Sequence, residues 1–157
     1  YYGVVEPNHL SAQRNGQVYA QLPAKSDIEV LENGQFANYH YSAGVVDFDT
    51  TGAEWMLVLN EVKLYCEKWN ESTKDYAMKK VNFTDGIMTP RLLKTNVGDI
   101  MTLNTVPAAS YAVGDVLKVD AQGFLSAAGT SAMEWTVVAE TTLPDAVTAA
   151  IKVQRTK

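Results

Sequence analysis

The sequence contains little of what disulfide-rich, metal-binding and membrane-spanning proteins depend on. Cys66 is the one cysteine in 157 residues, so no intrachain disulfide can form, and a zinc site with several thiolate ligands is excluded. The two histidines, His9 and His40, have no neighbouring set of metal ligands. The longest apolar run, Trp55–Leu59, is far shorter than the roughly 20 residues that a membrane-spanning helix needs. We therefore expect no structural metal, no cofactor and no membrane partner.

Basic residues are also scarce, since 13 Lys and Arg stand against 18 Asp and Glu and the net charge is −5. Nucleic-acid binding depends on clustered Lys and Arg, so we expect no direct contact with nucleic acid. Residues 1–6 lack the basic start and apolar stretch of a signal peptide. Together with the single cysteine, this favours synthesis in a reducing cytoplasm.

Motifs of catalysis are missing as well. The sequence has no Gly-x-Ser-x-Gly elbow, no phosphate-binding glycine-rich loop and no cysteine paired with a motif histidine. Residues 47–52 (Asp-Phe-Asp-Thr-Thr-Gly) resemble the start of a calcium loop. However, Val58 occupies the twelfth position in place of a bidentate Glu, so a plain acidic turn is the better interpretation. We predict that the protein is not an enzyme; a hydrolase whose carboxylates meet only in the fold is the least favoured alternative.

What the sequence has in plenty is β-branched residues: Val, Thr and Ile make up 36 of the 157 positions. Such side chains pack well on pleated sheets and lose rotamer freedom in helices. Four dipeptides in which glycine follows a polar residue predict tight turns with a positive φ angle at the glycine. They are Asn15-Gly16, Asn33-Gly34, Asp85-Gly86 and Gln122-Gly123. The sequence therefore predicts a mainly β fold, either a β-sandwich or a small β-barrel, with an extended N-terminal arm.

Three segments in the middle of the chain have distinct patterns. Residues 27–41 read as a hairpin that turns at Asn33-Gly34, with Phe36 and Ala37 on opposite faces. Residues 55–66 are apolar on both faces in a strand reading, which is typical of a central, doubly covered strand, although their length also permits a helix. Residues 67–80 are the most charged and are expected to form an exposed loop or short helix.

The last sixty residues give the clearest β signal. The pattern Val-Gly-Asp followed by an apolar residue occurs at Val97-Gly98-Asp99 and again 16 positions later at Val113-Gly114-Asp115. We interpret both copies as turns in which glycine supplies a special backbone conformation and Asp satisfies the turn backbone before a strand begins. A further turn at 120–123 with a return strand, and a pairing of 135–140 with 149–154, complete the predicted sheet.

Residues 1–26 differ from the rest because isolated apolar residues alternate with polar ones and no strand or helix period persists. We interpret this segment as an arm whose apolar side chains need a foreign surface, and residues 27–157 as one all-β domain with a possible sub-boundary near 90–97. Deleting such an arm would abolish attachment and leave the body folded. The predicted partner-binding residues are Tyr1, Tyr2, Val4, Val5, Pro7, Leu10, Val18, Tyr19 and Leu22.

Aromatic residues leave a second possibility open. Trp55, Trp69, Trp135 and the eight tyrosines could form a sugar-binding platform, although aromatics in all-β proteins more often anchor cores or interfaces. A glycan- or receptor-binding β-sandwich module is therefore the alternative to a structural role.

Several strings together resemble the decoration or cement proteins of tailed-bacteriophage heads. The strings are residues 6–13, 16–23, 54–65 and 94–99, with a C-terminal part comprising 112–117, 123–125, 135–138 and 150–153. The resemblance implies a structural virion protein, made in the host cytoplasm, that binds the outer capsid lattice and stabilises the head. Its implied partners are the major capsid protein and neighbouring copies of itself. The glycan- or receptor-binding alternative would place the module on a phage fibre or a cell-surface protein.

Overall fold

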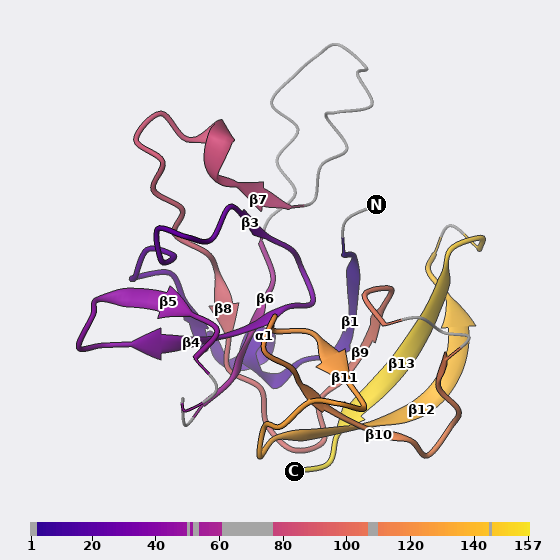
Figure 1. Cartoon of the computed structure of the whole chain (residues 1–157). Helices are drawn as coiled ribbons and strands as arrows, with labels where there is room; N and C mark the ends of the chain where they lie inside the picture. The colour runs from indigo at the N-terminus through magenta and orange to yellow at the C-terminus, as the bar shows by residue number, and fades with distance from the viewer. Residues whose placement is uncertain (1–2, 50, 52–53, 61–76, 107–109, 145) are drawn as a thin grey trace.

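The computed structural model describes residues 3–49, 51, 54–60, 77–106, 110–144 and 146–157, and over these residues the chain is mainly β, as predicted. The largest sheet has six antiparallel strands in the order β1-β9-β13-β12-β10-β11 (Figure 1). Its strands are β1 (Val5–His9), β9 (Ile100–Leu103), β10 (Val116–Val119), β11 (Leu125–Ser126), β12 (Glu134–Thr142) and β13 (Ala149–Arg155).

A second antiparallel sheet has five strands in the order β2-β8-β6-β4-β5, and a third pairs β3 with β7. These strands are β2 (Val18–Tyr19), β3 (Val30–Leu31), β4 (Phe36–His40), β5 (Val45–Asp47), β6 (Met56–Val58), β7 (Met78–Lys79) and β8 (Leu92–Leu93). The helices that lie wholly within the described residues are α1 (Ser11–Asn15) and the 3-10 helix η2 (Lys80–Asn82). No helix within the described ranges has the length and apolar character to cross a membrane.

The two larger sheets share one core. Phe36, Leu57 and Leu93 from the five-stranded sheet lie in the same buried cluster as Met101 and Trp135 from the six-stranded sheet. The Phe36 and Trp135 rings are tilted against each other with 5.7 Å between centroids. Open sheets that bury their inner faces against each other form a β-sandwich. The chain passes from the second sheet to the first between β8 and β9, near the predicted sub-boundary at 90–97. The shared core contains residues from both sides of this boundary.

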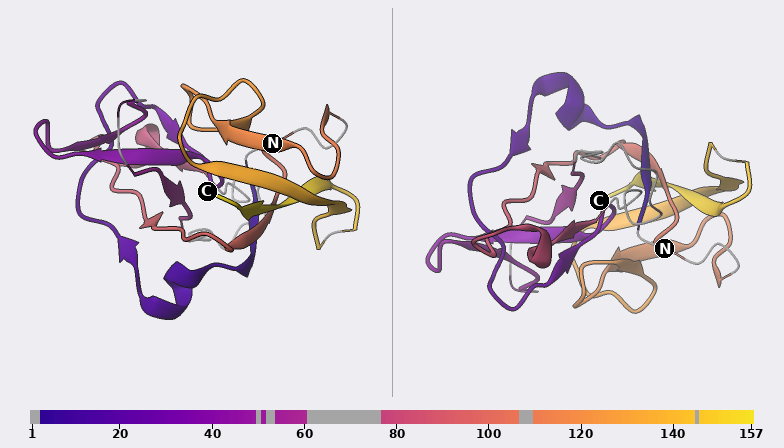
Figure 2. Two further views of the ribbon diagram at one scale, coloured as in Figure 1. Left: turned by 90° about the horizontal axis from the view of Figure 1, so that it is seen from below. Right: turned by 90° about the horizontal axis from the view of Figure 1, so that it is seen from above.

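The N-terminal segment is part of this sandwich. β1 pairs with β9, with Val5 opposite Leu103, and β2 pairs with β8 at the edge of the other sheet. Figure 2 shows the segment running along the outside of the molecule from one sheet to the other. Val5 and Leu10 are only 8% and 2% exposed, and both lie in the shared core. The interpretation of residues 1–26 as an arm that needs a foreign surface is therefore wrong for its described residues: the edges of the chain's own sheets supply the shelter.

The predicted hairpin at 27–41 is also wrong, although its turn forms. The N–H of Gln35 bonds to the carbonyl of Glu32 at 3.2 Å, but β3 then pairs with β7 instead of β4. The reason lies in β4, where Phe36 packs in the shared core and Ala37 in a second cluster on the opposite face. A strand buried on both faces takes a central position, and β4 does so between β5 and β6.

The prediction of a central strand at the apolar segment is confirmed for β6, Met56–Val58. Trp55 and Leu57 face the shared core, whereas Met56 and Val58 face the second cluster. β6 lies between β4 and β8. The remainder of this segment, 61–66, and most of the charged stretch at 67–80 lie outside the described residues; residues 78–79 form β7 and Lys80 begins η2.

The predictions for the C-terminal part are confirmed. The glycines of both Val-Gly-Asp copies have positive φ, +99° at Gly98 and +97° at Gly114, and a strand follows each turn. The turn at 120–123 leads into β11, which returns antiparallel to β10. β12 and β13 pair as expected and extend over Glu134–Thr142 and Ala149–Arg155.

Candidate functional site

A wide groove of about 1230 Å³ lies on the side of the molecule where β5 forms the edge of the five-stranded sheet. Its walls come from four parts of the chain: residues 23–30, the β4–β5 hairpin with residues 47–49, residues 80–87 and the turn at 121–124. Residues 23–25 cover the edge of β5, because the N–H of Lys25 donates to the carbonyl of Val46 at 2.9 Å. The groove is therefore built by tertiary packing of distant segments.

The lining combines an apolar surface with charged side chains. Apolar contacts come from Ile28, Val45, Phe48, Ile87 and Phe124, among others. The charged lining consists of five carboxylates and two lysines, namely Asp27, Glu29, Asp47, Asp49, Asp85, Lys25 and Lys80. The groove thus has an acidic balance, which sets the charge that a ligand must complement.

Most of these charges already have partners. Lys25 pairs with Asp27 at 3.0 Å, and Asp27 in turn raises the pKa of Lys25 through a hydrogen bond and its charge. Lys80 pairs with Glu29 at 3.2 Å and also donates to the carbonyl of Ser26 at 2.7 Å. Such exposed pairs contribute little to stability, but they hold the rim of the groove in one arrangement.

A histidine–aspartate pair lies in the same groove. The Nδ1 atom of His40 is 2.9 Å from Oδ2 of Asp47, and the other carboxylate oxygen of Asp47 accepts the N–H of Asp49 at 3.1 Å. Asp49 in turn accepts the N–H and the hydroxyl of Thr51, and these two bonds lower its pKa. The acidic turn predicted at 47–52 is confirmed over its described residues, with its carboxylates bonded to turn backbone.

None of the predicted partner-binding residues that the structure describes is fully exposed. Tyr1 and Tyr2 lie outside the described residues, and the buried side chains of Val5 and Leu10 have no surface to offer a partner. Val4, Pro7, Val18, Tyr19 and Leu22 are half-buried; Val18 packs on the shared core, and Tyr19 and Leu22 pack on the second cluster. These residues complete the fold.

The tryptophans do not form a sugar-binding platform among the described residues. Trp55 and Trp135 are buried in the shared core, and Trp69 lies outside the described residues. An aromatic that sequence reasoning did not single out, Tyr41, is 77% exposed and contacts Tyr39 at 5.6 Å between ring centroids. The spacing of Tyr39 and Tyr41 by two residues was the available signal, because it places both rings on one face of a strand. It does not show which of the two tyrosines is exposed to solvent.

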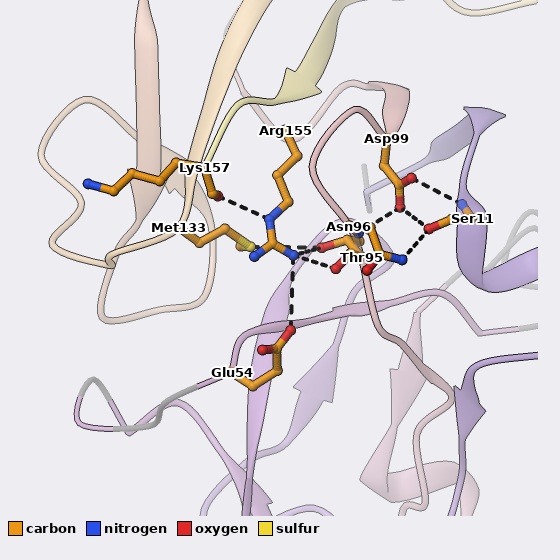
Figure 3. Close-up of polar contacts among 8 residues, drawn as sticks. All are labelled: Ser11, Glu54, Thr95, Asn96, Asp99, Met133, Arg155 and Lys157. Carbon is orange, nitrogen blue, oxygen red and sulfur yellow. Dashed lines mark hydrogen bonds and ion pairs between the residues drawn. The ribbon is translucent and has the colours of Figure 1, made fainter.

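A second polar cluster holds the N-terminal segment against the body (Figure 3). The buried carboxylate of Asp99 accepts the N–H of Ser11 at 3.2 Å, its hydroxyl at 2.9 Å and the N–H of Asn96 at 3.0 Å. Nearby, the Arg155 guanidinium donates to the carbonyl and the hydroxyl of Thr95. Because these polar groups bond to other parts of the chain, the cluster fixes the structure.

Over the described residues, no group of three or more His, Cys, Asp or Glu side chains is placed to hold a metal ion. No family model, curated protein or solved structure matches the chain.

Proposed function

We propose that this chain is a structural virion protein that binds the outer lattice of a tailed-phage head and stabilises the shell, with the major capsid protein and neighbouring copies as partners. The docking surface is a face of the folded sandwich, because the N-terminal segment that was expected to dock is built into the fold. Repeated over a lattice, a weak contact of this kind gives strong attachment through avidity.

One observation carries this proposal: both lysines of the groove are paired with carboxylates along its rim. Lys25 lies 3.0 Å from Asp27, and Lys80 lies 3.2 Å from Glu29. A general acid or nucleophile needs a group that can exchange a proton with a substrate, whereas charges paired along a rim suit recognition of a complementary surface. The arrangement supports docking over catalysis.

The test uses purified phage particles that lack the protein. Added full-length chain should co-sediment with them to saturation, appear as regular density on the outer surface in electron micrographs, and raise the temperature at which the shell releases its DNA, because binding to the assembled state stabilises it. Absence of co-sedimentation at high concentration, with the protein shown to be folded, would contradict the proposal.

Glycan binding remains a second candidate because of Tyr41. Its exposed ring contacts Tyr39, whose ring contacts Tyr19 in turn, and its neighbour in the sequence, His40, lines the groove. A supported, exposed ring next to polar groups is typical of sugar-binding surfaces. In a glycan array, binding that is lost in Tyr41→Ala and kept in Val81→Ala, a change at another exposed site, would favour this function over the structural one.

A further inference from the structure

The two Val-Gly-Asp turns have the same structure. The N–H of Asn96 donates to the carboxylate of Asp99 at 3.0 Å, and 16 residues later the N–H of Ala112 donates to that of Asp115 at 2.9 Å. Each glycine N–H then bonds to the neighbouring strand at 2.8 Å, from Gly98 to β13 and from Gly114 to β12. β9 and β10 are therefore equivalent strands, each with one long partner on the same side.

On its other side, β9 is covered by the N-terminal segment. His9 of β1 lies opposite Ile100, and the next residues bring Ser11 to the Asp99 carboxylate, which accepts both its N–H and its hydroxyl. Asp99 is 2% exposed as a result. The β9 edge and the Asp99 carboxylate therefore bind a strand that is followed by a small residue with a hydroxyl group.

On β10 no strand pairs at the corresponding place among the described residues. β11 pairs with Lys118 and Val119 only, which leaves Val116, the counterpart of Ile100, beyond its reach. Val116 is 47% exposed, and Asp115 is exposed as well.

The register shows that Val116 offers its backbone to this open side. The N–H of Asp120 bonds toward β11, to the carbonyl of Phe124, whereas the N–H of Val119 bonds to the hydroxyl of Ser131 on the β12 side. Since successive residues of a strand direct their N–H and C=O groups to opposite sides, Val116 shares the direction of Asp120. An unpaired strand edge of this kind is a template for a further strand.

We propose that the β10 edge at Asp115 and Val116 is a docking site for an extended segment of a partner protein. The segment pairs antiparallel with β10 through Val116 and presents a Ser or Thr, with its backbone N–H, to the Asp115 carboxylate, as Ser11 does at Asp99. Charge complementarity selects this occupant, because an exposed anionic acceptor is matched by donor groups. This inference rests on the proposed function in taking the partner to be a shell protein.

The first experiment uses a synthetic peptide of residues 3–15 of this chain, with capped ends, titrated into the isotope-labelled full-length protein. Amide shifts in NMR spectra should concentrate at Asp115 and Val116, and a peptide with Ser11→Ala should bind about tenfold more weakly, because a hydrogen bond to a charged group is lost. Shifts confined to Asp99 and Ile100, or no shift at saturating peptide, would overturn the inference.

Two variants of the protein sharpen the test. Asp115→Asn keeps an oxygen for the N–H of Ala112 but removes the charge, and Val116→Pro removes the outward N–H, a change that edge strands tolerate. Both should weaken the peptide about tenfold. The matched control is Asp120→Asn, which alters a turn carboxylate at the other end of β10 and should leave the affinity unchanged.

The same variants separate this inference from the proposed function. If the unchanged protein attaches to particles and Val116→Pro and Asp115→Asn attach equally well, the edge is not the docking site and the inference falls while the function stands. If the unchanged protein does not attach to particles, the function falls, and the peptide titration still decides whether the edge takes a strand.

Discussion

At the residue scale, position in the fold decides what a given side chain does. Asp99 and Asp115 occupy the same place in two equivalent turns, and each accepts the N–H of the residue three positions before it. Asp99 also accepts two bonds from Ser11 and is buried, whereas Asp115 is exposed. The sequence pattern predicts the shared bond, and only the packing of the N-terminal segment adds the others.

Exchanging these carboxylates for amides should therefore have unequal effects. Asn at position 115 retains one oxygen for one N–H and should cost less than about 0.5 kcal/mol of unfolding free energy. At position 99 both carboxylate oxygens accept hydrogen bonds from Ser11 and Asn96. An Asn there would place its NH₂ group, a donor, against one of these donors, and should cost about 1–3 kcal/mol of unfolding free energy. Urea unfolding of Asp99→Asn and Asp115→Asn compares the two, and equal losses would show that the Ser11 contacts contribute nothing.

The ionisation of Tyr39 gives a prediction for alkaline pH. Burial raises the pKa of this phenol above its ordinary value of 10.0, because the charged form loses its water. A group with a raised folded pKa contributes stability that is complete below its unfolded pKa and is lost as the pH rises through the folded pKa. Tyr39→Phe should therefore reduce the fall in melting temperature between about pH 8 and about pH 11, and an unchanged fall would contradict a buried phenol.

At the scale of elements, glycines mark the positions where strands can begin. Gly98, Gly114 and Gly123 have φ angles between +84° and +99°, which L-residues adopt at a cost. Around Gly98 and Gly114 an added Cβ atom would meet nothing within 4 Å, whereas at Gly123 it would lie 2.5 Å from the carbonyl oxygen of Phe36. The first two positions need glycine for conformation alone, and the third also needs it for space.

Alanine substitutions should separate conformation from space. Gly98→Ala and Gly114→Ala should each cost about 1–2 kcal/mol, in equal amounts, because the backbone strain is the same. Gly123→Ala should cost at least about 1 kcal/mol more, since β4 must shift away from the new methyl group. Thermal unfolding measures the loss of stability in all three variants. If Gly123→Ala loses no more stability than the other two, the β10–β11 turn can move to accommodate the methyl group without a free-energy cost.

At the scale of the whole molecule, the N-terminal segment joins the two sheets. It supplies an edge strand to each of them and places Val5, Leu10 and Ala12 in the core that the sheets share. Both sheet edges and the core are incomplete without it. Removing the segment should therefore impair folding, in contrast to a detachable arm, whose loss would affect attachment alone.

Truncation and a single substitution test this integration. A chain that lacks residues 1–16 should lose its cooperative unfolding transition, and Leu10→Ala in the full chain should cost about 2–5 kcal/mol by leaving a cavity. Val97→Ala, at a side chain that is 67% exposed, is the control and should change stability by less than about 0.5 kcal/mol. A truncated protein with the melting curve of the full chain would restore the arm interpretation.

Local patterns in the sequence determined the fold class and most of its parts. The positive-φ glycines, the two Val-Gly-Asp turns, the β12–β13 pair and the two-faced strand at residues 56–58 all follow from short-range rules of backbone conformation and side-chain alternation. These rules act between residues that are near in sequence, which is why a single sequence reveals them.

Only the tertiary structure decided which segments pair over long distances. That β3 joins β7, that residues 5–19 complete both sheets, and that four distant stretches line one groove depend on contacts between segments far apart in the chain. An isolated apolar residue such as Leu10 looks the same in the sequence whether a partner or its own chain covers it. The free energy of burial depends on the area removed from water, whichever surface removes it, so the sequence left that choice open.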